Sequence, residues 1–298
     1  MQTGPFTILT GPTAVGKTSL SLELAEWLGA DIISADSRQI YRELTIGTAK
    51  PTPEERARVS HHFIDEINLG TPFSAGAFAR QATERIRDIV DRGRLPLIVG
   101  GSTLYLHALQ FGLADIPPVA PEVRQHLENR LADEGADALF DELLRFDPAS
   151  AATLDPTKTQ RLVRALEVYY GTGLPLSSYH KDQEPPPFTF NAIVLNRDRK
   201  ALYARINQRV EGMLERGLLD EVRGLLERGF DPAEKALQTI GYQEPIAYLR
   251  GAIDYDEMVR LIKRNSRRYA KRQLTWFRRY PDYQWIPADT ALDFFDLQ

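Results

Sequence analysis

The chain has 298 residues, 43% of them hydrophobic, no cysteine and a formal net charge of −4. This length and apolar content allow one large core or two smaller ones and exclude extensive disorder. The lack of cysteine excludes disulfides and thiolate metal sites and predicts a reducing cytoplasm, and the first residues carry neither the basic flank nor the long apolar run of a signal peptide or membrane anchor.

The first hundred residues alternate apolar runs with helical periodicity. Strands are predicted at 6–10, 31–35 and 95–99, with amphipathic helices at 17–28 and 73–92 between them. Each helix is followed by a glycine, which is typical of a helix end. The pattern predicts an α/β fold, with a parallel sheet covered by helices on both faces.

After Gly112 the sequence becomes rich in proline, and it then shows helical periodicity without strand signals. A second proline-rich stretch, EPPPF at 184–188, precedes an apolar strand run at 188–196. We therefore predict a helical insertion at 113–187 between the two parts of the core, 1–112 and 188–298. In the second part, long helices are predicted at 202–229 and 255–280.

The stretch GPTAVGKT lies between the first strand and the first helix and fits the nucleotide-binding pattern G-x-x-x-x-G-K-[ST]. In such a loop, glycines let backbone N–H groups converge on phosphate oxygens, the lysine adds charge, and the last hydroxyl can hold Mg²⁺. The predicted phosphate-binding residues are Gly11, Pro12, Thr13, Ala14, Val15, Gly16, Lys17 and Thr18, with Thr18 also the candidate metal ligand.

Asp36 ends the second strand and is the only carboxylate found at the end of a predicted strand. The third strand runs instead into Gly100-Gly101-Ser102. Enzymes that hydrolyse nucleotides use a carboxylate at a strand end to hold the metal. Asp36 could therefore be a metal ligand or a base for another reaction, and the loop alone does not decide between them.

Nine basic residues and no acidic one occur between Arg260 and Arg279. Because the chain as a whole is acidic, this block predicts either a docking face for a polyanion or an ordinary solvated helix face. The two interpretations are about equally good on the sequence pattern alone.

Seven separated segments resemble the bacterial tRNA dimethylallyltransferases of the IPP transferase family, and they span nearly the whole chain in the same order. They are ADSRQIYRELTIGTAKP (35–51), HHFID (61–65), VGGSTLYLHAL (99–109), QRLVRALEVYYGTG (160–173), RINQRVEGMLERGLLDEVRGLLERG (205–229), QTIGYQE (238–244) and KRQLTWFRR (271–279).

The resemblance implies that the loop holds dimethylallyl diphosphate rather than ATP. The acceptor would be the N6 amine of adenosine 37 in tRNA, with Asp36 accepting its proton. Ser37, Arg38 and Gln39 would receive the extruded base, with the Gln39 amide available to its edge. Ser102, which stands where the family usually has threonine, would lie near the reacting centre, and Arg223 would contact the diphosphate. Mg²⁺ is the expected cofactor.

Further tRNA contacts follow from the same resemblance. Gln243 stands where the family commonly has a basic residue, so a phosphate contact there is expected to be weaker or to have moved. In the helix at 160–164, the two arginines lie three residues apart and share a face. The implied tRNA-binding residues are Asp36, Ser37, Arg38, Gln39, Ser102, Arg124, Gln160, Arg161, Leu162, Val163, Arg164, Gln238, Thr239, Ile240, Gly241, Tyr242 and Gln243.

Three other functions remain open at this point. A small-molecule kinase would explain the loop and Asp36 but not the basic block. An adenylate isopentenyltransferase would use the same donor with a free nucleotide, and a non-catalytic RNA-binding protein would bind tRNA without modifying it. The expected partners are the tRNA anticodon stem-loop and dimethylallyl diphosphate, with no membrane partner, and the expected state is a monomer.

Overall fold

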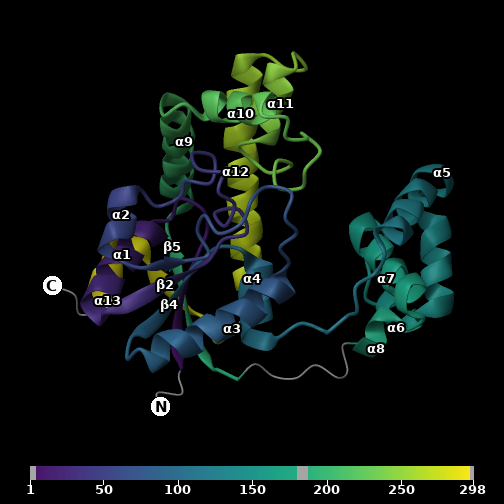
Figure 1. Ribbon diagram of the computed structural model, residues 1–298, viewed down its shortest axis with the longest axis horizontal. Coiled ribbons are helices and arrows are strands. Elements are labelled where there is room, and N and C mark those ends of the chain that lie inside the picture. The colour runs from purple at the N-terminus through teal and green to yellow at the C-terminus, as the bar shows by residue number, and fades with distance from the viewer. Residues whose placement is uncertain (1–4, 180–186, 296–298) are drawn as a thin grey trace. The chain divides into compact units, whose positions relative to one another are not determined.

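The structure, a computed structural model, describes residues 5–179 and 187–295 and divides into two compact units (Figure 1). The first unit comprises Met1–Gln110 and Pro186–Gln298, and the second comprises Phe111–Pro185. Most of the proline-rich stretch at 184–188 lies outside the described residues. Over the part of the chain that is described, no helix has the length and apolar character needed to cross a membrane.

The first unit is built on a six-stranded parallel sheet with strand order β3-β2-β4-β1-β5-β6. The central strand β1 pairs with β4 on one side and β5 on the other. The strands are β1 (Phe6–Thr10), β2 (Ala30–Ala35), β3 (His61–His62), β4 (Leu95–Gly100), β5 (Phe190–Asn196) and β6 (Gln284–Pro287).

Helices cover both faces of this sheet, as successive residues of one strand show. Ile8 packs into a core cluster with Phe78 of α3, whereas Leu9 packs into a separate cluster with Leu24 of α1. Alternate side chains of a strand point to opposite faces, so both faces are buried. The expected α/β class is confirmed. The helices of this unit are α1 (Lys17–Leu28), α2 (Pro53–Arg58), α3 (Ala75–Asp91), α4 (Thr103–Phe111), α9 (Arg199–Glu215), α10 (Leu218–Glu227), α11 (Gln243–Leu249), α12 (Tyr255–Phe277) and α13 (Ala291–Phe294), with a short 3₁₀ helix at Ala288–Thr290.

The prediction of one long helix at 202–229 is wrong, because the chain breaks between α9 and α10 at Gly217. This glycine has φ 93° and precedes the first residue of α10. A left-handed backbone is strained for other residues, and here it turns the chain between two amphipathic helices. The short outer strands β3 and β6 were not predicted either, since neither is long enough to show a period of two.

The second unit contains only helices among its described elements. They are α5 (Pro121–Phe146), α6 (Pro148–Ala151), α7 (Thr159–Thr172) and α8 (Leu176–Tyr179). Its core includes Leu127 and Leu139 of α5 and Leu162 and Leu166 of α7, all fully buried. α5 is kinked at Gly135, where φ is 85°.

Candidate active site

The loop that the sequence predicts to bind phosphate follows β1 and ends where α1 begins at Lys17. Gly11 has φ 144°, and a side-chain Cβ at this position would lie 2.6 Å from the carbonyl oxygen of Leu195 in β5. Gly16 has φ 117°. Both positions therefore require glycine, Gly11 because of backbone conformation and close approach together and Gly16 because of its conformation. The loop has the strand–glycine turn–helix form that lets its N–H groups face an anion.

Lys17 folds back over this loop, and its Nζ donates to the carbonyl oxygens of Gly11 and Pro12 at 2.9 Å each. Burial, reinforced by the nearby Arg209 guanidinium, lowers the pKa of Lys17 from 10.5 to about 7. The negative charge of Asp36 opposes this shift. The Lys17 amine is thus desolvated, and a bound anion would stabilise its charged form.

A cavity of about 510 Å³, here called the loop cavity, opens beside residues 13–19 and Asp36. Three arginines from the α9 region, Arg205, Arg209 and Arg216, line it together with Lys17. Arg205 Nε donates to the Ala14 carbonyl at 2.9 Å, so it also supports the loop. Burial lowers the pKa of Arg209. This concentration of positive charge is suited to a ligand with several negative charges.

A second cavity of about 420 Å³, here called the neighbouring cavity, shares five lining residues with the loop cavity. The shared residues are Thr13, Ala14, Asp36, Arg209 and Tyr269. A ligand in either cavity would therefore meet Asp36 and Arg209. The remaining wall includes Ser37, Arg38, Gly47, Thr48, Ser102, Met213, Arg272 and all six residues of the segment 238–243.

Asp36 sits where the two cavities meet, directly after β2. Its Oδ1 accepts the backbone N–H groups of Arg38 at 2.9 Å and Gln39 at 3.3 Å, which fixes the carboxylate in the turn. The Ser37 N–H donates to Ser102 Oγ at 2.9 Å, and the Ser102 N–H donates to the Ala35 carbonyl at 3.1 Å. These two bonds join the ends of β2 and β4. Because the two strands are parallel neighbours, their carboxyl ends lie at the same edge of the sheet, which brings Asp36 and Ser102 to one place.

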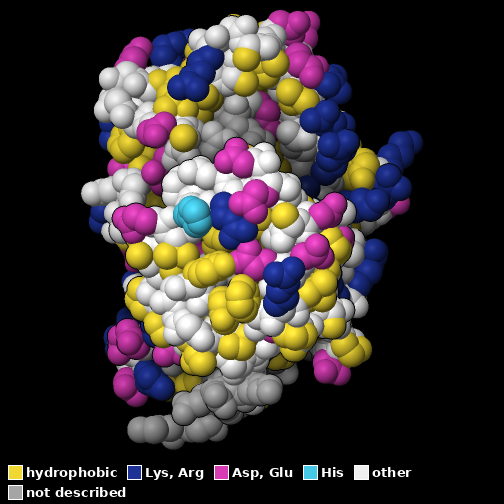
Figure 2. Space-filling model, turned by 90° about the vertical axis from the view of Figure 1, so that its right-hand side faces the viewer, with side chains coloured by type: hydrophobic (Ala, Val, Ile, Leu, Met, Phe, Trp, Pro, Cys, Tyr) yellow, Lys and Arg dark blue, Asp and Glu magenta, His cyan; other side chains and the backbone are white. Residues whose placement is uncertain are grey.

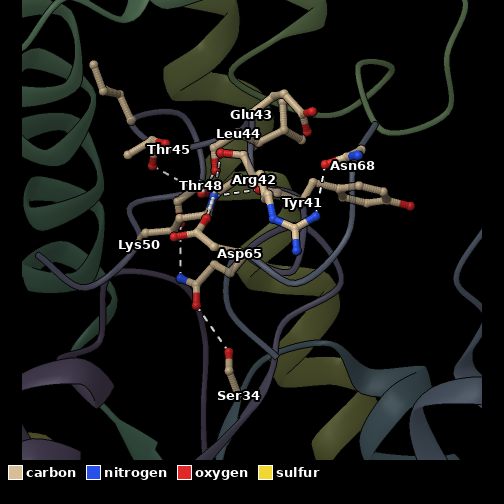
Figure 3. Close-up of polar contacts among 12 residues, drawn as sticks. Ser34, Tyr41, Arg42, Glu43, Leu44, Thr45, Thr48, Lys50, Asp65 and Asn68 are labelled. Carbon is tan, nitrogen blue, oxygen red and sulfur yellow. Dashed lines mark hydrogen bonds and ion pairs between the residues drawn. The ribbon is translucent and has the colours of Figure 1, made fainter. Parts of the chain in front are cut away.

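The Gln39 amide is engaged inside the protein at both ends. Its Oε1 accepts the Ser34 hydroxyl at 3.1 Å, and its Nε2 donates to the carbonyl oxygens of Thr48 at 3.3 Å and Ala49 at 3.2 Å. Figure 3 shows this connection between Ser34 at the lower end and the segment that carries Thr48. The side chain therefore supports the wall of the site, whereas the sequence suggested an amide available to a base edge.

Arg223 lies away from both cavities. It projects from α10, is about half exposed, and pairs with Asp220 one turn earlier at 2.5 Å. The arginines that line the loop cavity were missed. Arg205 and Arg209 are four residues apart on α9 and share a helical face. That spacing, directly after the strand that pairs with β1, was the available sequence signal.

Among the predicted residues of the second unit, Leu162 and Val163 are buried in its helical core. Gln160 and Arg161 are exposed on α7. The remaining arginines hold ion pairs to the same carboxylate: Arg124 pairs with Glu167 at 3.2 Å and Arg164 at 3.1 Å. On α7, the exposed side chains of Gln160 and Arg161 can reach a ligand, whereas Leu162 and Val163 stabilise the packing of the helices.

Seven of the nine residues of the basic block lie on α12, which runs beside α9 (Figure 1), and Arg278 and Arg279 directly follow its end. Arg260 pairs with Glu257 and Lys263 pairs with Glu211, each at 2.6 Å. The other seven have no carboxylate partner within the described ranges, and Arg268, Lys271 and Arg272 are exposed. In the face of the molecule drawn in Figure 2, Lys and Arg side chains gather at the upper right.

The comparisons with known proteins agree with one another. A family model described as IPP transferase matches residues 39–280. The tRNA dimethylallyltransferase of Salinibacter ruber is 64% identical over 285 residues, which cover 95% of this chain and 88% of that protein. A tRNA isopentenylpyrophosphate transferase from Bacillus halodurans has a solved structure with 41% identity and TM-score 0.72, covering 98% of this chain and 94% of that one. A eukaryotic dimethylallyltransferase acting on tRNA gives TM-score 0.80 at 27% identity, covering 98% and 79%.

Proposed function

The chain belongs to the IPP transferase family, and we propose that it transfers a dimethylallyl group from dimethylallyl diphosphate to the N6 amine of adenosine 37 in tRNA, beside the anticodon. The enzyme is a transferase. The C–O bond between the allylic carbon and the diphosphate breaks, and a C–N bond to the adenine forms. The products are N6-dimethylallyladenosine, diphosphate and a proton.

The observation that carries this proposal is the pair of cavities that meet at Asp36 and Arg209. One cavity is lined by a phosphate loop and cations, and the other has a mixed polar and apolar wall. A diphosphate in the loop cavity would face the N–H groups of the loop, with Lys17 and Arg209 neutralising its charge. Its allylic carbon would then point to the shared boundary, where an acceptor in the neighbouring cavity could reach it.

Mg²⁺ fits this donor site. Within residues 5–179 and 187–295, no group of three His, Cys, Asp or Glu side chains is placed to hold a metal ion. Mg²⁺ in phosphate sites, however, is commonly held by one or two protein oxygens together with substrate phosphates. Thr18 is exposed in the loop cavity and makes no side-chain hydrogen bond within the described chain, so its hydroxyl could serve. The ion would supply charge neutralisation of the leaving diphosphate.

Asp36 is proposed to accept the proton of the attacking amine. An adenine amine is a weak nucleophile because its lone pair is delocalised into the ring, and a positioned carboxylate assists as the C–N bond forms. The two backbone N–H groups on Oδ1 leave Oδ2 for this role. The adenine must leave its stack to enter, at a cost of a few kcal/mol that the tRNA contacts would offset.

Those contacts are proposed to come from α12, from residues 238–243, and from the polar residues of the second unit, namely Arg124, Gln160, Arg161 and Arg164. The arginines and lysines of α12 that have no carboxylate partner in the described chain suit the phosphate backbone, which dominates RNA affinity. We propose that the enzyme acts as a monomer on cytoplasmic tRNA.

The test is incubation with labelled dimethylallyl diphosphate, Mg²⁺ and tRNA that lacks modification at adenosine 37. We expect label at that nucleoside, identified by digestion and mass spectrometry, and no ATP consumption. Labelling of free AMP in preference to tRNA would favour an adenylate isopentenyltransferase. Phosphoryl transfer from ATP without prenylation would favour a kinase, and tRNA binding without labelling would favour a non-catalytic protein.

A further inference from the structure

The carboxylate of Glu221 on α10 gathers four hydrogen bonds from two distant segments. Its Oε2 accepts the backbone N–H groups of Thr45 at 3.2 Å and Ile46 at 2.7 Å. Its Oε1 accepts the Gly47 N–H at 3.3 Å and the Tyr242 hydroxyl at 2.6 Å. Three successive N–H groups that converge on one anion form a nest, and bonds to an ionised acceptor are stronger than neutral ones.

The two segments that Glu221 joins also pack directly against each other. A Cβ at Gly47 would lie 2.4 Å from the ring of Tyr242, which is fully buried. Burial, followed by the charge of Glu221, raises the pKa of Tyr242, so the hydroxyl stays a donor. Gly47 and Tyr242 both line the neighbouring cavity, whereas Glu221 does not. Glu221 therefore shapes that wall without touching what the cavity holds.

The segment 44–50 is anchored on its other side by separate contacts. Lys50 Nζ, whose side chain is almost fully buried, donates to Asp65 Oδ1 at 2.5 Å and to the Tyr41 carbonyl at 2.5 Å (Figure 3). The Thr48 hydroxyl donates to the Leu44 carbonyl at 2.9 Å. These contacts fix the base of the segment, and the three N–H groups of 45–47 are left to Glu221.

We propose that Glu221 is a positioning residue for the acceptor adenosine, holding the segment 45–48 against Tyr242 so that the cavity wall keeps the geometry in which the amine faces Asp36. This inference rests on the proposed function and adds to it a residue with no direct substrate contact. It assigns α10 to the acceptor side, through Glu221, rather than to the diphosphate.

The main test replaces Glu221 by glutamine, with Glu227→Gln as control because Glu227 is exposed on the same helix. An amide keeps one acceptor oxygen but turns an NH₂ donor toward the N–H groups. We expect kcat/KM for a synthetic anticodon stem-loop RNA to fall about 10- to 100-fold, as a misplacement near 1 Å does. Binding of the unreactive donor analogue dimethylallyl thiodiphosphate should change by no more than about twofold.

Tyr242→Phe provides a second, milder variant, because it keeps the ring against Gly47 and removes only one hydrogen bond. Tyr242→Phe should lower kcat/KM for the stem-loop RNA less than Glu221→Gln does. Because both residues act through one carboxylate, the fall in kcat/KM of the double variant should be smaller than the product of the two single falls. A folded Glu221→Gln enzyme with control-like kcat/KM would overturn the proposal, as would an equal loss of donor-analogue binding. If Glu221→Gln does not fold, unchanged kinetics in Tyr242→Phe overturn it. A wild-type enzyme that fails to prenylate RNA would instead overturn the proposed function.

Discussion

Gln273 holds the phosphate loop through Thr13: its Oε1 accepts the Thr13 N–H at 2.9 Å while its Nε2 donates to the Gly101 carbonyl at 2.8 Å. The side chain comes from α12 and is 2% exposed. A Cβ at Gly101 would lie 2.4 Å from Nε2, so this approach requires the glycine. One amide thus joins the basic helix, the phosphate loop and the end of β4.

Replacing Gln273 by methionine should destabilise the fold, because the Thr13 N–H and the Gly101 carbonyl would lose their partner. We expect the free energy of unfolding in urea to fall by about 1–3 kcal/mol. Gln81→Met, at an exposed position of α3, should change it by less than about 0.5 kcal/mol. Equal stability of the two variants would show that water replaces the amide without cost.

Replacing Asp36 by asparagine should slow prenyl transfer with little effect on RNA affinity. Asparagine keeps an oxygen for the Arg38 N–H but cannot take a proton from the amine. Single-turnover rates should fall by about 10² to 10⁴. RNA binding is measured separately by filter retention. A matching loss of RNA affinity would mean that Asp36 positions the base instead of activating it.

We expect replacements of Arg209 and Arg223 to differ in their effect on donor binding. Arg209→Gln should weaken dimethylallyl thiodiphosphate binding by about 10- to 100-fold, the value of a charge-assisted hydrogen bond. Arg223→Gln should leave it unchanged if the diphosphate occupies the loop cavity, because Arg223 faces Asp220. Calorimetric titration of both variants decides between them. A loss confined to Arg223→Gln would restore the role that the family resemblance implied.

Donor binding should depend on pH through Lys17. Its pKa of about 7 leaves it largely neutral at pH 8, and a bound diphosphate favours the charged form. Affinity should therefore fall as the pH rises above 7, with proton uptake on binding at pH 8. Calorimetry in two buffers of different ionisation enthalpy measures that uptake, and Lys17→Arg should abolish it.

The lowered pKa of Lys17 also makes the free energy of unfolding depend on pH. Between pH 7 and about 10 the unfolded chain holds more protons on Lys17 than the folded one. This group alone therefore makes the free energy of unfolding increase with pH in that window. In Lys17→Arg this rise should be missing from urea titrations across the range, and an identical profile in the variant would contradict the burial of the ammonium group.

The basic block should set the salt dependence of RNA binding. Changing Arg268 and Lys271 to glutamine should weaken binding and lower the slope of log K against log salt by roughly 0.7 to 0.9 for each phosphate that the protein no longer neutralises. Arg260→Gln is the control, because that arginine already pairs with Glu257. An unchanged slope in the double variant would remove this part of α12 from the RNA interface.

The sequence predicted those parts of the fold that short-range patterns determine. The run 6–10 and the helix 17–28 have the predicted bounds, because an apolar run, a glycine turn and helical periodicity are all local. At Gly217 the apolar pattern continues across the glycine, so only the backbone conformation reveals two helices. The two-residue strand β3 forms because it pairs with β2, and a segment of two residues is too short to show a strand pattern in the sequence.

In the candidate site, too, the residues that were predicted belong to local sequence motifs. The sequence predicted the glycine turn that ends at Lys17, because that motif is contiguous, and the structure has this turn beside the loop cavity. Arg209 was not predicted because its place depends on how α9 packs beside the sheet. The hydrogen bonds of the Gln39 amide were not predicted because its acceptors, Thr48 and Ala49, lie about ten residues further along the chain. The contacts of Glu221 join residues more than a hundred positions apart, which no local pattern could indicate.

The bend at Gly217 has a consequence for how one stretch of chain serves two ligands. In an uninterrupted helix, twelve residues would separate Arg209 from Glu221 by about 18 Å along a single axis. Because the chain bends at Gly217, α9 places Arg209 in the wall of the loop cavity, while α10 places Glu221 behind the wall of the neighbouring cavity. Because Gly217 has φ 93°, any other residue would strain the backbone at this bend, and we expect the strain to shift the walls of both cavities although Gly217 lines neither.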